Sequence, residues 1–228
     1  MGQNIERTLL SFPDVSVRII GKEEKPPSGE LDGVLIANQS AGHARTALPY
    51  IEAGVATFIE KPIATTVVDA ERIQGAADRS GAVVFVGHIF LYHPAFVVAL
   101  KLLPSFGPIR YLLCEGMNDA PRTDSSVLWD WLPHDLSMAH AIFSRNPDLV
   151  EAWSLAGEAT PQAVLSIFQY GETPLVSSIS CSRRSSGGRR RSSAKMQRWF
   201  LMTGLNGGWR STTSMATSQI QYIPTNYL

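Results

Sequence analysis

The sequence has little cysteine and no long apolar run. Its 228 residues include only Cys114 and Cys181, too few for a disulfide framework and wrongly spaced for a zinc site. A membrane-spanning helix needs about 20 consecutive apolar residues, and no segment approaches that length. The N-terminus also lacks the basic stretch and apolar core of a secretory signal. We therefore expect a protein of the reducing cytoplasm with no membrane partner.

Acidic side chains are absent from residues 181–228, although the whole chain carries 20 acidic and 20 basic residues. This segment therefore forms a basic tail attached to an acidic body. Such tails can bind nucleic acid or anionic membranes. The zero net charge hides an asymmetry that needs its own explanation.

The first part of the chain alternates short apolar runs with helical patterns, an order typical of βαβ units around a parallel sheet. Strands are predicted at residues 15–20, 33–37, 55–59 and 83–86, and helices at 43–53 and 67–79. The polar link between the first two strands is too short for a crossover helix. The pattern predicts an incomplete Rossmann-like domain over residues 1–87.

The pattern changes after residue 87 to strands with few helices between them. Helical spacing is found at residues 94–103 and 136–143, and strand patterns at 109–115, 164–170 and 175–180. Such an order favours a mixed or antiparallel sheet. The predicted fold class is therefore α/β, with a partial α+β domain over residues 88–180 after the parallel sheet.

The sharpest local signal is Glu60-Lys61-Pro62, directly after a predicted strand. A lysine at the carboxyl end of a parallel strand faces the crevice where α/β sheets bind ligands, and proline forces the chain to turn there. A solvated Glu–Lys pair is the competing interpretation. The tripeptide alone does not decide between the two.

Three further segments accompany this tripeptide. They are Asn38 and Gln39 with His43, residues 87–95, and Asp130 with His134 in an Asp-x-x-x-His pattern. In this order and spacing the four segments resemble the Gfo/Idh/MocA family of NAD(P)-dependent sugar oxidoreductases. The resemblance covers residues 32–169.

The resemblance implies a reaction and roles for three side chains. Hydride transfer between a sugar or nucleotide-sugar hydroxyl and NAD or NADP needs a base for the hydroxyl proton. The family's histidine matching His134 commonly serves as that base, the lysine matching Lys61 stabilises the developing negative charge, and Asp130 orients the pair. A desolvated Lys61 is the alternative base. A hydrogen-bonded core histidine is the competing interpretation of His134.

The resemblance also implies cofactor contacts and partners. The expected cofactor-binding residues are Gly2, Asn38, Gln39, His43, Glu60 and Lys61. By position alone, Glu23 or Glu24 is a candidate for reading the ribose. The second domain is expected to bind the small-molecule substrate and to support a homo-oligomer through its sheet. No metal is expected, because His134 and His140 face different sides of a helix.

The glycine-rich turn that opens a dinucleotide-binding fold is absent. Its form is Gly-x-Gly-x-x-Gly, and its backbone amides receive the pyrophosphate. Gly2, before a helix-like stretch, is expected to be the last glycine of such a turn. The expected loss of the first, central strand would leave unpaired edges and a damaged pyrophosphate site.

The basic segment departs from the family in a second way. Residues 194–203 imply a set of possible codons. If these codons are read in the frame that starts two nucleotides later, they can be chosen to encode Glu-Asn-Ala-Ala-Met-Val-Phe-Asp-Asp. That text resembles a family strand and turn ending in two aspartates. We therefore hypothesise a frameshift between about residues 177 and 193 and expect residues 181–228 to form an out-of-frame tail that is disordered or poorly packed.

Three alternatives to the oxidoreductase are open on the sequence. The first is a catalytically inactive remnant of the family that acts as a binding or dimerisation module. The second is a nucleic-acid binder that uses the basic tail, although no nucleic-acid partner is expected. The third is a relative that uses NAD for glycoside cleavage, which only product analysis would separate.

Overall fold

The computed structural model describes residues 2–21, 31–118, 126–156, 161–181, 196–203 and 220–226. The chain divides into two compact units, Met1–Gly87 and His88–Leu228. The division falls directly after the last strand of the first sheet.

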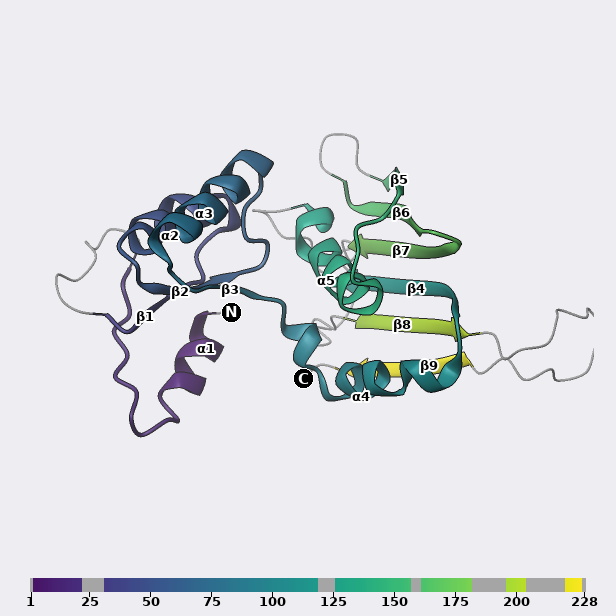
Figure 1. Cartoon of the computed structure of the whole chain (residues 1–228), viewed down its shortest axis with the longest axis horizontal. Helices are drawn as coiled ribbons and strands as arrows, with labels where there is room; N and C mark the ends of the chain where they lie inside the picture. The colour runs from purple at the N-terminus through teal and green to yellow at the C-terminus, as the bar shows by residue number, and fades with distance from the viewer. Residues whose placement is uncertain are drawn as a thin grey trace, which may run out of the picture. The chain divides into compact units, whose positions relative to one another are not determined.

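The first unit is built on three parallel strands in the order β1–β2–β3 (Figure 1). The elements are α1 (Gly2–Leu9), β1 (Gly33–Ile36), α2 (His43–Glu52), β2 (Ala56–Glu60), α3 (Val67–Ser80) and β3 (Val84–Gly87). Thr66 begins α3 by accepting a hydrogen bond from the Asp69 amide, and Gly81 ends it at φ 72°, a left-handed conformation that suits glycine. The predicted parallel, Rossmann-like order is confirmed.

The helices α2 and α3 lie on the same face of this sheet (Figure 1). The core of the unit consists of Ile36, Ala44, Ala47, Leu48, Ile51, Ile59, Ala64, Ile73 and Ala76. On the other face Leu35, Phe58 and Phe85 are cross-strand neighbours, and the rings of Phe58 and Phe85 stack at 5.7 Å. Leu35 and Phe85 remain exposed within the described part of the chain, whereas parallel sheets are usually covered on both faces.

The strand predicted at residues 15–20 is wrong. These residues form no regular secondary structure, and the side chains of Val15 and Ile19 are exposed. A β-rich sequence becomes a strand only where a neighbour completes its hydrogen bonds and covers its side chains. The described sheet order begins at β1, so this segment has no such neighbour.

The second unit is built on a mixed sheet in the order β5–β6–β7–β4–β8–β9. The strands are β4 (Ile109–Asn118), β5 (Leu149–Ala156), β6 (Ala163–Tyr170), β7 (Thr173–Cys181), β8 (Met196–Thr203) and β9 (Ile220–Asn226). Strands β4 and β7 pair in parallel, and the other neighbours are antiparallel. The mixed sheet confirms the predicted α/β class, while β5 was not predicted.

Two helices accompany this sheet, α4 (Pro94–Leu102) and α5 (Val127–Phe143). From helical spacing, the sequence predicted only residues 136–143 of α5, although a proline does not exclude a longer helix. The helix instead continues through Pro133 and buries Val127, Trp131, Met138 and Ala139 in the core. Packing of that face outweighs the hydrogen bond that Pro133 cannot donate.

The sheet continues past its expected end near Ser180. Strand β8 pairs with β4, and β9 pairs with β8. These two strands correct the expectation of a disordered or poorly packed tail over residues 181–228 at residues 196–203 and 220–226, whereas residues 182–195 and 204–219 lie outside the described part. Main-chain hydrogen bonds at a sheet edge depend little on the identity of the side chains, so an apolar segment such as residues 196–203 can add to it.

Candidate functional site

The carboxyl edge of the first sheet carries a buried lysine. Lys61 follows the last residue of β2, the central strand. Glu60 and Lys61 are 6% and 7% exposed, and the peptide bond between Lys61 and Pro62 is cis. Open α/β sheets bind their ligands at this edge. The competing interpretation, a solvated Glu–Lys pair, is therefore not what the structure contains.

His43 ties two loops of this edge together. Its ring is buried, with Nδ1 2.7 Å from the carbonyl oxygen of Pro62 and Nε2 3.2 Å from that of Asn38. The Asn38 side chain in turn donates from Nδ2 to Thr46 Oγ1 in α2, at 2.9 Å. Because both ring nitrogens face backbone carbonyls, His43 holds the loops after β1 and β2 rather than presenting a nitrogen to a ligand.

The Glu60 carboxyl is buried beside charged and polar groups. Burial raises its pKa, while the Lys61 amide, which donates to Oε2 at 3.3 Å, and the charges of Lys61 and His43 act in the opposite direction. Gly87 is its cross-strand partner in β3. A Cβ at Gly87 would lie 2.8 Å from the Phe58 ring and 3.3 Å from the carboxyl group. The position therefore requires glycine, and the perturbed carboxyl beside a lysine is typical of functional sites.

Asp130 and His134 lie one turn apart on α5, on the same side of the helix. Both are buried. The His134 ring meets the Phe90 ring edge-on, with 4.2 Å between their centroids, and is 6.3 Å from the Trp131 ring. A buried imidazole held in this way can keep or move a proton in a fixed direction. The same packing against Phe90 and Trp131 is that of a core histidine.

Trp131 forms a close contact between α5 and the second sheet. Its ring packs on Gly116 of β4, where an added Cβ would lie 2.9 Å from the indole. Trp131 is therefore a core residue, as expected for most tryptophans, whereas Trp129 is exposed. His93 caps α4 by accepting from the Ala95 amide at 3.2 Å, so this histidine has a structural role.

The predicted site residues are divided between the two units. Asn38, Gln39, His43, Glu60 and Lys61 belong to the first unit, and Asp130 and His134 to the second. Gly2 is the first residue of α1. Glu23 and Glu24 lie outside the described residues. The side chains of Asn38 and Gln39 are exposed at the carboxyl edge.

Sequence reasoning gave no role to Asp135, the residue after His134. Its side chain is fully buried and accepts a hydrogen bond from Ser177 Oγ of β7 at 2.6 Å. Burial, together with the charge and hydrogen bonding of Asp135, raises the pKa of the Cys114 thiol well above its ordinary value. The available signal was Ser177 itself, since serine interrupts the apolar alternation of Leu175 and Ile179.

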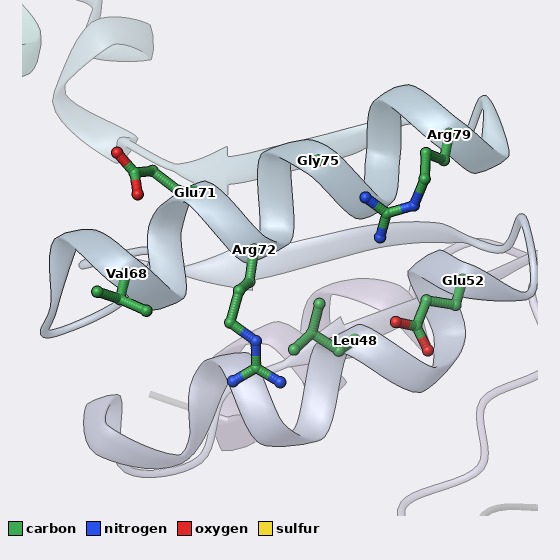
Figure 2. A pocket seen from close by; sticks show the side chains of 7 residues that line it. All are labelled: Leu48, Glu52, Val68, Glu71, Arg72, Gly75 and Arg79. Atoms are coloured by element: carbon green, nitrogen blue, oxygen red, sulfur yellow. The ribbon is translucent and has the colours of Figure 1, made fainter.

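Helices α2 and α3 form a groove of about 350 Å³ on the first unit. Leu48 and Glu52 line it from α2, and Val68, Glu71, Arg72, Gly75 and Arg79 from α3 (Figure 2). None of the predicted site residues belongs to this lining. The side chains carry mixed charges, and Arg72 is already paired with Asp69. The groove therefore lacks a charge pattern that would select a ligand.

Within the described ranges, no group of three His, Cys, Asp or Glu side chains could hold a metal ion. His140 is exposed while His134 is buried, consistent with the different sides of α5 that they face. None of the described helices is long and apolar enough to cross a membrane.

Comparison with known proteins relates the first unit to one family. Residues 12–88 match the model of an oxidoreductase family with an NAD-binding Rossmann fold, GFO_IDH_MocA. UDP-N-acetylglucosamine 3-dehydrogenase of Acidithiobacillus ferrooxidans is 32% identical over 129 residues, which are 56% of this chain and 41% of that protein. Inositol 2-dehydrogenase of Paracoccus denitrificans is 32% identical over 114 residues, 50% of this chain and 33% of that protein.

A likeness to solved structures extends over both units. The crystal structure of a protein from Magnetospirillum magnetotacticum MS-1 matches with a TM-score of 0.74 and 22% identity, covering 96% of this chain and 83% of that one. At this identity the match describes the fold. The chain spans less than half the length of the curated relatives it matches.

Proposed function

This chain belongs to the Gfo/Idh/MocA family of oxidoreductases, and we propose that it oxidises a hydroxyl or reduces a carbonyl of a sugar or nucleotide sugar. The buried Lys61 at the carboxyl end of β2 carries this proposal. An amine is seldom buried unless its surroundings compensate the loss of water or its chemistry needs it. The relatives, named for dehydrogenation of UDP-N-acetylglucosamine and inositol, support a polyhydroxylated substrate and an enzyme over an inactive remnant.

The proposed cofactor is NAD or NADP, bound along the carboxyl edge of β1–β3. The exposed amides of Asn38 and Gln39 and the buried Glu60 and Lys61 suit the nicotinamide end of such a cofactor, because they offer donors and acceptors at one edge. The sequence has no Gly-x-Gly-x-x-Gly run for the pyrophosphate, so the proposed fit concerns the nicotinamide end of the cofactor. His43 contributes indirectly by holding both loops. When bound, the cofactor accepts or supplies the hydride.

The proposed roles divide proton handling among three side chains. His134 takes the proton of the reacting hydroxyl through its imidazole, whose ring is held by Phe90. Lys61 stabilises negative charge that develops on the substrate, because its amine is shielded from water. Asp130, one turn before His134, orients the imidazole and favours its charged form. Lys61 is the alternative base. A cytoplasmic setting belongs to the same proposal.

The experiment is a cofactor and substrate test with four variants. We expect the full chain to bind NAD(H) or NADP(H), measured by calorimetry, and to turn over UDP-N-acetylglucosamine or inositol, measured as absorbance at the nicotinamide band. Lys61→Ala and His134→Ala should lower turnover by at least about a hundredfold. The matched controls Lys101→Ala and His140→Ala change exposed residues of the same types and should leave turnover unchanged. A folded chain that binds neither cofactor would refute the proposal.

We further propose that the open face of the second sheet forms a homodimer. Leu113, Val176 and Ile167 lie in one cross-strand row on the side opposite the buried Leu112, Leu175 and Phe168. Trp153 of β5, on the next row, is exposed. Light scattering after gel filtration should give a dimer, and Trp153→Lys should give monomers. Val68→Lys, a control at an exposed apolar residue of α3, should leave the mass unchanged.

A further inference from the structure

A row of small polar residues crosses the buried face of the second sheet. Cys114 of β4 is the cross-strand partner of Ser177 of β7, and Ser177 is the partner of Ser166 of β6. All three are buried. The neighbouring rows are apolar or small: one contains Leu112, Leu175 and Phe168, and the other contains Gly116, Ile179 and Val164. The polar row is thus a local interruption of the core.

Asp135 of α5 meets this row with its side chain. Ser177 donates to its carboxylate at 2.6 Å, and the Cys114 thiol also hydrogen-bonds to it. Burying a carboxylate costs several kcal/mol unless donors replace the lost water. A serine and a cysteine from two adjacent strands supply those donors here. The contact therefore requires one particular alignment of α5 on β4 and β7.

The alignment of α5 determines where its other side chains point. Successive residues of a helix are turned by about 100°, so a fixed Asp135 also fixes the direction of His134, its neighbour. Asp130 lies four residues before His134 and therefore on the same side of the helix. Apolar contacts such as Trp131 on Gly116 press the helix against the sheet, but they tolerate small rotations better than a buried charged hydrogen bond does.

We propose that Asp135 is a positioning residue for the reaction: held by Ser177 and Cys114, its carboxylate fixes the rotation of α5 and thereby directs His134 and Asp130 at the reacting hydroxyl. The inference rests on the proposed function only for the identity of the reaction. Its structural part, the coupling of Ser177 to the environment of the His134 ring, holds whether or not the chain turns over a sugar.

The first measurement separates positioning from simple stabilisation. The imidazole nitrogens of His134 are observed by long-range ¹H–¹⁵N NMR, with the signals assigned by His134→Gln. Ser177→Ala and Asp135→Asn should shift the His134 signals and change their dependence on pH, while the His140 signals of the same helix stay in place. Ser177→Thr, which keeps a hydroxyl, should restore the wild-type pattern. Ser177→Ala is the milder change and decides the matter if Asp135→Asn fails to fold.

Two serines provide matched controls. Ser166 is buried in the same row, but among the residues that the structure describes its Oγ has no hydrogen-bond partner. Ser178 follows Ser177 on the opposite face of β7. Ser166→Ala and Ser178→Ala should leave the His134 signals unchanged. If either control shifts them as strongly as Ser177→Ala does, the coupling through Asp135 is refuted.

The second measurement is kinetic. Ser177→Ala should lower kcat by about ten- to a hundredfold, the loss typical of slight misplacement of a catalytic group, with KM for the cofactor unchanged. Unchanged kcat together with unchanged His134 signals would overturn the proposal, as would a loss of stability alone. If the wild-type chain turns over no substrate, the proposed function fails, and the NMR comparison still decides the positioning role.

Discussion

Replacing Gly116 by alanine tests how tightly α5 is packed on the second sheet. The new methyl group would lie 2.9, 3.1 and 3.1 Å from three atoms of the Trp131 indole, where ordinary contacts between carbons are about 3.5 to 4.0 Å. The indole is only 3% exposed and lies beside the His134 ring, so it has little room to retreat. We expect a destabilisation of about 1 to 3 kcal/mol, as for overpacked cores.

The tryptophans make this prediction simple to measure. All five lie after residue 88, so the loss of tryptophan fluorescence in urea follows the second unit alone. The midpoint should fall without a change in the denaturant slope. The double variant Gly116→Ala with Trp131→Phe should recover part of the loss, because the smaller ring relieves the contact. An unchanged midpoint in Gly116→Ala would refute the packing argument.

Gly75 in α3 is the matched glycine for this test. An added methyl group there meets only Arg79 Nη1 at 3.2 Å, the end of an exposed and flexible side chain. Glycine inside a helix costs about 0.5 to 1 kcal/mol relative to alanine. Gly75→Ala should therefore stabilise the first unit and leave the fluorescence transition of the second unchanged. Equal effects at both glycines would mean that the contact with Trp131 does not decide the outcome.

Four further predictions concern other sites. The pKa of Glu60 is raised on folding, so this group favours folding at low pH, and the advantage is lost as pH rises through the folded pKa. At neutral pH, Glu60→Gln should therefore protect residues 43–60 from hydrogen exchange in urea. This gain in protection should vanish near about pH 4, where Glu60 is protonated in both states. His43→Ala should cost about 1 to 3 kcal/mol, as buried carbonyls lose their partner, and speed proteolysis after Pro62, whereas the exposed Arg45→Ala control should do neither. In the native state iodoacetamide should modify the half-buried Cys181 before the buried Cys114; equal rates in mass spectrometry would contradict the burial argument. Resequencing the coding DNA across codons 177–193 tests the predicted frameshift, and an unchanged reading frame would refute it.

Much of the first unit could be predicted because its boundaries depend on local chemistry. Helix α3 runs from the Thr66 cap to Gly81, and both signals are visible in the sequence. The chain around Lys61 was likewise recognisable, because Glu60-Lys61-Pro62 directly follows an apolar run. In these places propensity, capping and turn chemistry agree with the tertiary structure.

The errors arose where long-range contacts decide the outcome. Helix α5 continues through Pro133 because its buried face packs on the sheet, and residues 15–20 remain irregular because no strand is paired with them. Residues 149–155 of β5 are exposed, so this strand lacks the alternation of buried and exposed residues that would have indicated it. The role of Asp135 depends on the register of β4 against β7, strands more than about 50 residues apart in the chain, which no local pattern contains.

The bridge that His43 forms between the carbonyls of Asn38 and Pro62 has a thermodynamic consequence for ligand binding. Two loops from different strands are joined through one rigid ring, so their relative freedom is lost when the protein folds rather than when a ligand arrives. A molecule that contacts both loops then meets a surface that is already assembled. Its affinity is not reduced by the entropy of ordering them.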